Sequence, residues 1–300
     1  MSEAGGLRRR RRLALPAGFA RIERPGDIAL VDPDWRVPLE AAGLLDPRRV
    51  RMRLAEAHEC PRATPRGRAP IAIVAVAGRG ERIALRGLRR GGWLGTLLGA
   101  RLAGPGRPFH ELDTTARLHA VGAPVPRPVF ALAWQRGLAW NAAIGTVFVE
   151  HAIDAGAWLA RGPSQDRLHA GLHAAGRALR RFHDAGGSHP DLHVGNLLVR
   201  EASGTPEILV IDLDLAHAGA APSPARRLRQ LMRLHRSLHK RGLLAAAGAD
   251  RGSLRVLHAY VAGDRELRRA LLAHLPRERR RLARHALLYR RHGERLRTVF

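Results

Sequence analysis

Between residues 71 and 150, apolar and polar positions alternate in a way that predicts two β-hairpins with one helix between them. The expected elements, in order, are a strand at 71–77, a strand at 82–86, a helix at 109–121, a strand at 129–134 and a strand at 146–150. The turn Gly78-Arg79-Gly80-Glu81 closes the first hairpin, and a loop near Asn141 closes the second. This part of the chain is therefore predicted to be rich in β-structure.

Further along the chain, apolar positions recur every three or four residues, which predicts helices. A long helix is expected over 167–185, ended by Gly186-Gly187. Two short strands follow at 196–199 and 207–211, and the sequence after Pro224 has a helical and very basic pattern. The later part of the chain is therefore predicted to be mainly helical.

These patterns predict an α+β fold with two lobes. Residues 51–150 form the β-rich N-lobe and residues 151–300 form the α-rich C-lobe, with a linker near 150–154. Residues 1–50 alternate Arg clusters with Pro and Gly and show no sustained period, so we expect a poorly ordered basic arm there.

The composition narrows the class of protein. No uninterrupted apolar run approaches the roughly 20 residues that cross a bilayer. The apolar stretch after Arg8–Arg12 is broken at Pro16, too early for a secretory signal. Cys60 is the only cysteine, which excludes an intrachain disulfide, and no Cys/His spacing indicates zinc. We expect a cytoplasmic protein.

The charge is strongly positive. The formal net charge is +26, and Lys240 is the only lysine, so arginine supplies nearly all the positive charge. The use of Arg in place of Lys is expected of a GC-rich genome, and the positive charge indicates an anionic partner: nucleotide phosphates, nucleic acid or a membrane surface. Aromatic residues make up 4% and no nucleic-acid motif is present, so nucleic acid is not the expected partner.

The segment His189-Pro190-Asp191-Leu192-His193-Val194-Gly195-Asn196 carries the clearest chemistry. In the pattern His-x-Asp-x-x-x-x-Asn, Asp191 can accept the proton of an attacking hydroxyl, and Asn196 can return to the same site as an oxygen ligand of a metal. His189 braces the loop, while His193 either contacts substrate or packs. Surface carboxylates on unrelated turns are the alternative interpretation. The conjunction of residues favours a protein-kinase-like phosphotransferase.

Two acidic residues complete the expected metal site. Asp212 ends the apolar strand Ile208-Leu209-Val210-Ile211, so its carboxylate is predicted to emerge at the end of that strand, and Asp214 follows two residues later. Carboxylate and amide oxygens suit a hard cation. Asn196, Asp212 and Asp214 are therefore the predicted ligands of Mg²⁺, and Asp191, Asn196 and Asp212 the predicted catalytic residues, with ATP as phosphate donor.

Phosphate binding in the N-lobe is expected to depend on arginine. Ile83-Ala84-Leu85-Arg86 stands where such kinases place a strand ending in lysine, so Arg86 is the predicted phosphate ligand and Glu111 its predicted partner. The alternative is that both are solvated surface charges. Gly67 and Arg68 mark a reduced glycine-rich loop with one glycine, and they complete the predicted nucleotide-binding residues.

From about residue 60 to 245 the chain resembles the lipopolysaccharide kinase family, and within it the 3-deoxy-D-manno-octulosonic acid (Kdo) kinases. The resemblance rests on Leu85-Arg86 followed by Leu88-Arg89-Arg90-Gly91-Gly92, on Phe109-His110-Glu111 leading to Gly122-Ala123-Pro124-Val125-Pro126-Arg127-Pro128, on the catalytic loop, on Ile211-Asp212-Leu213-Asp214 in place of Asp-Phe-Gly, and on Arg233-Leu234-His235-Arg236-Ser237-Leu238-His239-Lys240. The Arg-Arg-Gly-Gly and Arg-Ser-Leu segments are its specific part.

The resemblance implies ATP, Mg²⁺ and phosphorylation of a Kdo hydroxyl on a lipid A precursor during lipopolysaccharide biosynthesis. It also implies a peripheral enzyme on the cytoplasmic face of the inner membrane, where an arginine-rich surface can bind anionic lipid and a glycolipid substrate. Two other interpretations stay open. One is a small-molecule kinase of the aminoglycoside phosphotransferase type, although few clustered carboxylates are available for a cationic substrate. The other is a catalytically impaired pseudokinase scaffold.

Overall fold

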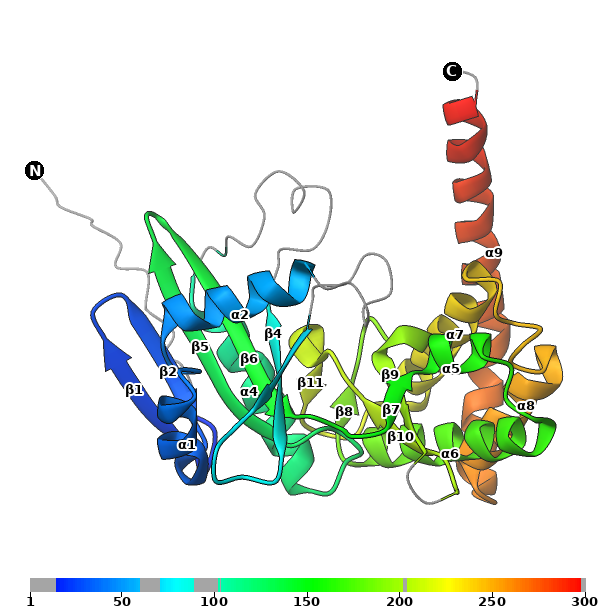
Figure 1. Ribbon diagram of the computed structural model, residues 1–300. Helices are drawn as coiled ribbons and strands as arrows, with labels where there is room; N and C mark the ends of the chain where they lie inside the picture. Colours follow the sequence, from blue (N-terminus) through cyan, green and yellow to red (C-terminus); the bar gives the residue numbers. More distant parts are fainter. Residues whose placement is uncertain (1–14, 60–70, 89–101, 103, 202–203, 298–300) are drawn as a thin grey trace, which may run out of the picture. The chain divides into compact units, whose positions relative to one another are not determined.

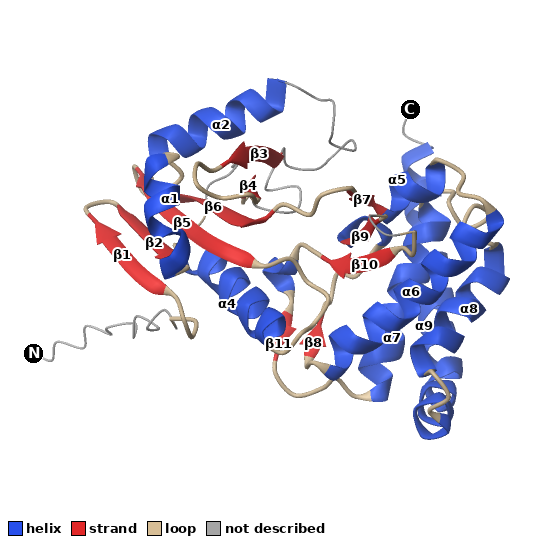
Figure 2. Ribbon diagram, turned by 60° about the horizontal axis from the view of Figure 1, so that its bottom comes forward, coloured by secondary structure: helices blue, strands red, loops and turns tan. Residues whose placement is uncertain are grey.

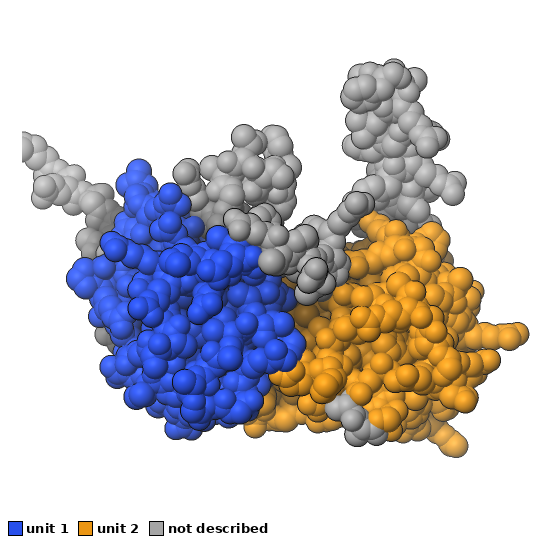
Figure 3. Space-filling model, in the orientation of Figure 1, with its two compact units in different colours: residues 1–117, 127–148 blue, residues 118–126, 149–300 orange. Residues whose placement is uncertain are grey.

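The computed structural model describes residues 15–59, 71–88, 102, 104–201 and 204–297, except for the side chains of 58–59 and 282–297. The chain divides into two compact units (Figure 3). Unit 1 comprises residues 1–117 and 127–148, and unit 2 comprises 118–126 and 149–300. The division near the middle of the chain thus falls between Phe148 and Val149, where we expected it between 150 and 151.

Unit 1 is built on a six-stranded antiparallel sheet with the strand order β1-β2-β5-β6-β4-β3 (Figure 1). Its strands are β1 (Ala20–Arg24), β2 (Asp27–Val31), β3 (Ile71–Ala75), β4 (Arg82–Gly87), β5 (Pro128–Arg136) and β6 (Ala139–Val147). Its helical elements are η1 (Pro33–Trp35), α1 (Arg36–Ala41), α2 (Pro47–Glu59) and α4 (Gly106–Ala120), the last of which ends in unit 2.

Both faces of this sheet are covered, which explains why β5 is almost entirely apolar. Phe130 and Leu132 face a cluster that contains Trp35 of η1. Ala131 faces the opposite way, into a cluster that contains Phe109 of α4. Because successive side chains of a strand point to opposite faces, a strand covered on both sides needs an apolar residue at every position. Figure 2 shows α2 on one side of the sheet and α4 on the other.

The first predicted hairpin is confirmed, and the turn of the second was misplaced. β3 pairs with β4 in the register Ile71↔Arg86. β5 and β6 also form a hairpin, but its turn lies at Gly137 and Leu138, and Asn141 lies within β6 opposite Trp134. Gly137 adopts φ +62°, which glycine tolerates without a Cβ clash and which a two-residue hairpin turn requires.

The expectation of a poorly ordered arm over residues 1–50 was wrong for the residues from 20 onward. β1 and β2 pair in the register Ala20↔Val31, and β2 pairs with β5 through Leu30↔Ala131. Tertiary pairing with β5 and the burial of Trp35 stabilise a segment whose local sequence, broken by Pro and Gly, shows no sustained period. Residues 1–14 lie outside the described part of the chain.

Unit 2 is mainly helical and carries two small sheets, with strand orders β10-β9-β7 and β11-β8. Its helices are α5 (Ala155–Ala160), α6 (Gln165–Asp184), α7 (Pro224–Lys240), α8 (Ala249–Val261) and α9 (Arg265–Arg297), and its 3₁₀ turns are η3 (Val194–Asn196) and η4 (Leu213–Leu215). Its strands are β7 (Ala152–Asp154), β8 (Gly187–Ser188), β9 (Leu197–Arg200), β10 (Glu207–Val210) and β11 (His217–Ala218). A linker was expected near 150–154. The structure instead has strand β7 there, which pairs with β9.

The long helix α6 organises the core of unit 2. Its residues Leu179 and Phe182 are fully buried, and burying each such side chain contributes roughly 1.5–3 kcal/mol. α6 ends before Gly186, which adopts φ +83°, and a Cβ there would lie 1.8 Å from the carbonyl oxygen of Gly219. Only glycine therefore suits the position that turns the chain from α6 into β8. β8 leads into residues 189–196, the predicted catalytic loop.

The α+β class is confirmed, with a β-rich N-terminal unit and an α-rich C-terminal unit. The expected order of strand, strand, helix, strand, strand is found as β3, β4, α4, β5 and β6. Within the described residues, no helix combines the length and the apolar character that a membrane span requires.

Candidate functional site

The imidazole of His189 joins the two segments that carry the predicted catalytic residues. Its Nε2 lies 3.4 Å from the carbonyl oxygen of Ile211 and 3.3 Å from the side-chain nitrogen of Asn196. Its Nδ1 lies 3.3 Å from the backbone nitrogen of Asp191. Burial lowers the pKa of His189 below its ordinary value, although its bond to Ile211 and the nearby Asp212 and Asp191 carboxylates oppose this effect. At neutral pH the ring is uncharged and serves as a spacer that braces the loop, as predicted.

Asp191 has a fixed backbone and an accessible carboxylate. Its carbonyl oxygen accepts a hydrogen bond from the Asn196 side chain at 3.2 Å. Its side chain is 40% exposed and forms an ion pair with Arg233. A half-exposed carboxylate on a braced loop has the placement that a group accepting a proton from a substrate hydroxyl needs.

Asn196 and Asp212 are brought together by backbone pairing. Asn196 is buried at the end of η3, and its carbonyl oxygen accepts a hydrogen bond from the nitrogen of Ile211 at 2.9 Å. Asp212 follows directly and adopts the left-handed conformation, with φ 64°. Such a conformation in a residue other than glycine costs free energy and concentrates at functional sites. Asp214 lies two residues on, half-buried in η4.

The donor set of this site fits a hard divalent cation. The amide nitrogen of Asn196 donates to the Asp191 carbonyl, which fixes the orientation of the amide. Asn196 and Asp212 offer only oxygen ligands, the type that Mg²⁺ prefers, and Mg²⁺ in kinases keeps waters and phosphate oxygens as further ligands. Among the described residues no group of three or more His, Cys, Asp and Glu side chains is placed to hold a metal ion by itself.

Helix α7 contacts the catalytic loop at three successive points, and none of its three contact residues was among the predicted site residues. Gln230 Oε1 accepts a hydrogen bond from His189 N at 2.7 Å, and Ser237 Oγ accepts one from Val194 N at 2.9 Å. Between them, Arg233 pairs with Asp191. The spacing 230, 233, 237 places one polar side chain per helical turn on one face. These polar residues, three and four positions apart, are the sequence signal that could have identified the helix face in contact with the loop.

A buried polar network continues from Gln230 into the core of unit 2. His183 is fully buried; its Nδ1 lies 2.7 Å from the Tyr260 hydroxyl, and its Nε2 lies 3.3 Å from Gln230 Oε1. Burial lowers the pKa of His183 to about 4 and raises that of Tyr260 to about 12. Both groups are therefore uncharged at neutral pH, with Tyr260 donating to Nδ1 and Nε2 donating to Gln230. The network thus fixes the side-chain amide of Gln230, whose oxygen accepts the hydrogen bond from the backbone nitrogen of His189.

Unit 1 contains the predicted pair of Arg86 and Glu111. The guanidinium of Arg86 in β4 forms an ion pair with Glu111 in α4, whose side chain is 5% exposed. The interpretation as two solvated surface charges is therefore wrong. A role of the pair in binding nucleotide phosphates stays a prediction. Gly67 and Arg68, the other predicted nucleotide-binding residues, lie outside the described part of the chain.

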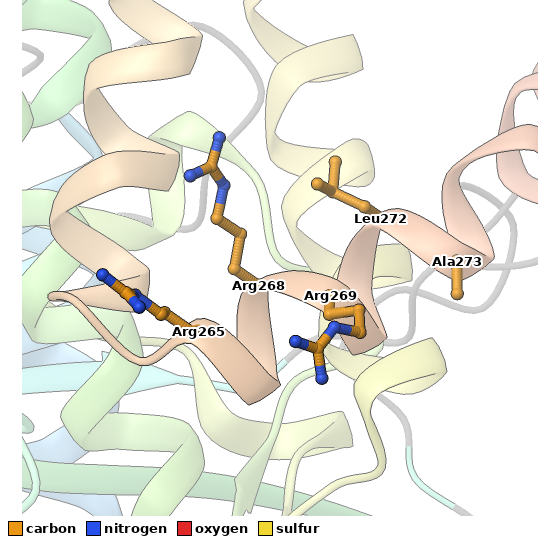
Figure 4. Close-up of a pocket in the computed structure, with 5 residues that line it drawn as sticks. All are labelled: Arg265, Arg268, Arg269, Leu272 and Ala273. Atoms are coloured by element: carbon orange, nitrogen blue, oxygen red, sulfur yellow. The ribbon is translucent and has the colours of Figure 1, made fainter.

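A shallow basic hollow of about 490 Å³ lies on the first turns of α9. Figure 4 shows the residues that line it: Arg265, Arg268, Arg269, Leu272 and Ala273. Leu272 is an exposed large apolar side chain. A surface that combines arginines with an exposed leucine suits an anionic surface with apolar character beneath it.

Comparison with known proteins finds one family profile that matches most of the chain and several relatives of similar sequence. The profile of the lipopolysaccharide kinase (Kdo/WaaP) family matches residues 69–283. The 3-deoxy-D-manno-octulosonic acid kinase of Vibrio cholerae serotype O1 is 31% identical over 161 residues, which cover 52% of this chain and 65% of that protein. The enzyme of the same name from Mannheimia succiniciproducens is 32% identical over 168 residues, covering 54% and 67%.

Two further matches are another enzyme of that name and a solved structure. The 3-deoxy-D-manno-octulosonic acid kinase of Xanthomonas axonopodis pv. citri is 34% identical over 166 residues, covering 53% of this chain and 61% of that protein. The chain thus spans between 61% and 67% of the length of these relatives. A solved structure, WaaP in complex with acyl carrier protein, is 22% identical with a TM-score of 0.48, covering 79% of this chain and 97% of that chain.

Proposed function

Because the chain belongs to the lipopolysaccharide kinase (Kdo/WaaP) family, we propose that it transfers the γ-phosphate of ATP to a sugar hydroxyl, specifically that of Kdo on a lipid A precursor. The observation that carries the proposal is the catalytic loop of unit 2. There, His189 bridges Asp191, Asn196 and the residue before Asp212 in one hydrogen-bonded frame. Relatives of similar sequence bear the name Kdo kinase, which supports this acceptor over others.

In this proposal Asp191 orients the attacking hydroxyl and takes its proton. Phosphoryl transfer needs little covalent chemistry from the protein, so positioning and charge account for most of the rate enhancement. The neutral ring of His189 fixes the Asp191 backbone. Asn196 and Asp212 would hold Mg²⁺, which when bound neutralises charge on the phosphates. Arg86, fixed by Glu111, binds the phosphates of ATP.

The site also bears on the two alternative functions. A pseudokinase has no physical requirement to keep a proton acceptor and two oxygen ligands in one hydrogen-bonded frame, so the geometry of Asp191, Asn196 and Asp212 supports an enzyme. An acceptor of the aminoglycoside type is cationic. Arg233 beside Asp191 disfavours a cation at the position where the hydroxyl must bind.

The proposed location is the cytoplasmic face of the inner membrane, with the protein bound peripherally. The basic hollow formed by Arg265, Arg268, Arg269, Leu272 and Ala273 supports this location, since arginine near an anionic lipid surface contributes about 1 kcal/mol per residue. Arg268→Gln combined with Arg269→Gln should weaken binding to vesicles that contain anionic phospholipid, and should leave phosphorylation of a detergent-dispersed acceptor unchanged.

The test of the function is transfer of labelled γ-phosphate from Mg·ATP to a Kdo-containing lipid A precursor. Wild type is compared with Asp191→Ala and Asp212→Ala. Label on the Kdo lipid that disappears in both variants supports the proposal. ATP binding without transfer points to another acceptor, and absence of ATP binding by the wild type points to the scaffold.

A further inference from the structure

Helix α7 holds the catalytic loop without needing Arg233. Gln230 and Ser237 bind backbone nitrogens at the two sides of Asp191, through neutral hydrogen bonds of 2.7 and 2.9 Å. Both loop nitrogens are thereby satisfied, and the loop is fixed to the helix one turn before and one turn after Arg233. The pairing of Arg233 with the Asp191 side chain needs a reason other than holding the loop.

The Arg233–Asp191 pair also contributes little to folding. The two side chains are 41% and 40% exposed, and ion pairs of such exposure are typically worth about 0–1 kcal/mol because water screens them. A guanidinium presents five N–H donors in a planar fork. Asp191 accepts from Nη2, and among the described residues Nε has no hydrogen-bond acceptor. Arg233 therefore keeps donors for a further anion.

The position of that anion follows from the role of Asp191. A hydroxyl bound to Asp191 lies within a few ångströms of the Arg233 guanidinium, because the two side chains share a hydrogen bond. A guanidinium fork matches a carboxylate in shape and charge. In the proposed function the phosphates of ATP are assigned to Arg86 and to the Mg²⁺ that Asn196 and Asp212 would hold, whereas Arg233 contacts the residue that receives the acceptor.

We propose that Arg233 binds the carboxylate of an acidic sugar acceptor and so selects sugar acids over neutral sugars. The inference rests on the proposed function and names the group of the acceptor that the site recognises. On binding, the carboxylate takes the donors of the fork that Asp191 leaves unused and sets the distance from the carboxylate to the hydroxyl that reacts. Arg233 is thus a determinant of specificity that touches the substrate.

The experiment compares two acceptors that differ in one charge. The first is a Kdo-bearing lipid A precursor, and the second is the same molecule with the Kdo carboxylate converted to a carboxamide. The kcat and KM of each acceptor, and the KM of ATP, are measured for wild type, Arg233→Gln and Arg233→Lys. Arg226→Gln is the matched control, because Arg226 lies on the same helix, is exposed, and loses the same charge.

Wild type and Arg226→Gln should prefer the carboxylate over the carboxamide by about ten- to a hundredfold in kcat/KM, the range of one charge-assisted pair. Arg233→Gln should reduce that ratio to about one, mainly by raising the KM of the carboxylate acceptor. Arg233→Lys should restore part of the preference, since it keeps the charge and loses the fork. Thermal unfolding should be the same for all variants to within a few degrees.

Three results overturn the inference while leaving the kinase intact. They are a wild type active on both acceptors without preference, an Arg233→Gln variant that keeps the preference, and an Arg233→Gln variant that loses activity on both acceptors equally with a raised KM for ATP. The last result would assign Arg233 to the γ-phosphate. A wild type that phosphorylates neither acceptor overturns the proposed function itself, and the inference with it.

Discussion

Each unit of the molecule contains several ion pairs between arginine and a carboxylate, and the two pairs that involve predicted site residues differ in burial. Arg86 and Glu111 in unit 1 are 23% and 5% exposed, while Arg233 and Asp191 in unit 2 are 41% and 40% exposed. The same chemistry therefore serves two purposes. The buried pair contributes to the stability of the fold and holds Arg86 in place, and the exposed pair can exchange partners with a ligand.

The physical reason is the cost of removing charge from water. When one member of a pair is buried, its charge cannot be fully solvated after its partner is removed. In an exposed pair water replaces the lost partner at little cost. Mutation of Glu111 should therefore mainly lower stability, and mutation of Asp191 should mainly lower the rate of phosphate transfer.

The largest expected effect is on chemistry, in the exposed pair. Asp191→Asn should lower kcat by roughly 10²–10⁴-fold, because the amide cannot accept the hydroxyl proton. It should change the free energy of unfolding by less than about 1 kcal/mol. Phosphate transfer and urea unfolding on the same preparations check both numbers. A loss of several kcal/mol in stability would contradict the distinction between the two pairs.

The next effect is on stability, in the buried pair. Glu111→Gln should destabilise unit 1 by about 3 kcal/mol, because it replaces the buried carboxylate of the ion pair with a neutral amide beside the Arg86 guanidinium. Hydrogen exchange should accelerate in α4 and β4 and stay unchanged in α6.

The matched control for Glu111→Gln is Glu207→Gln. Glu207 pairs with Arg200 across β9 and β10, and both side chains are more than 40% exposed. This control should cost less than about 1 kcal/mol. An equal loss of unfolding free energy in the two variants would show that burial does not determine how much each ion pair stabilises the fold.

The pH dependence of unit 2 follows from His183. Its pKa is lowered from 6.5 to about 4 in the folded state, so the unfolded state binds more protons between these values. The stability that neutral His183 allows is complete above pH 6.5 and is lost as the pH falls toward 4, by about 3 kcal/mol in total.

His183→Gln isolates this contribution. The free energy of urea unfolding, measured at several pH values between 4 and 7.5, should rise less steeply with pH in His183→Gln than in wild type. The difference in slope should correspond to at most one proton bound on unfolding. The lower overall stability of the variant does not affect this slope. An unchanged slope would show that the buried His183 does not titrate with unfolding.

The smallest expected effect is at the edge of the loop. Ser237→Ala removes the acceptor of the Val194 nitrogen and should cost about 1 kcal/mol, with a decrease of only a few-fold in kcat. Exchange of the Val194 amide, followed by NMR, should accelerate locally. Ser253→Ala is a control on α8, since Ser253 bonds His235 outside the catalytic loop. A loss of activity as large as that of Asp191→Asn would assign Ser237 a direct role.

Local patterns predicted much of the fold. The hairpin of β3 and β4, the helix α4 and the long helix α6 were predicted because each is stabilised by contacts close in sequence or by a regular apolar period. The segment from β1 to α2 was not, because its stability comes from pairing with β5, about a hundred residues away. The turn at Gly137 was misplaced because the polar Asn141 favoured a loop there, whereas β6 continues through Asn141 in register with Trp134.

The predicted site divides in the same way. Asp191, Asn196 and Asp212 were predictable because a short motif and a strand end determine their spacing. Their roles, with that of Asp214, stay predictions. Gln230, Arg233 and Ser237 come from a helix some forty residues away, and no local rule joins them to the loop.

The amino-acid sequence by itself determined the α+β class and the short spacing of Asp191, Asn196 and Asp212, since these depend on residue types over short stretches of chain. Only the tertiary structure decided which arginine meets which carboxylate and how far water reaches each pair. Burial is a property of packing between distant segments, and burial determines how much an ion pair contributes to the stability of the fold.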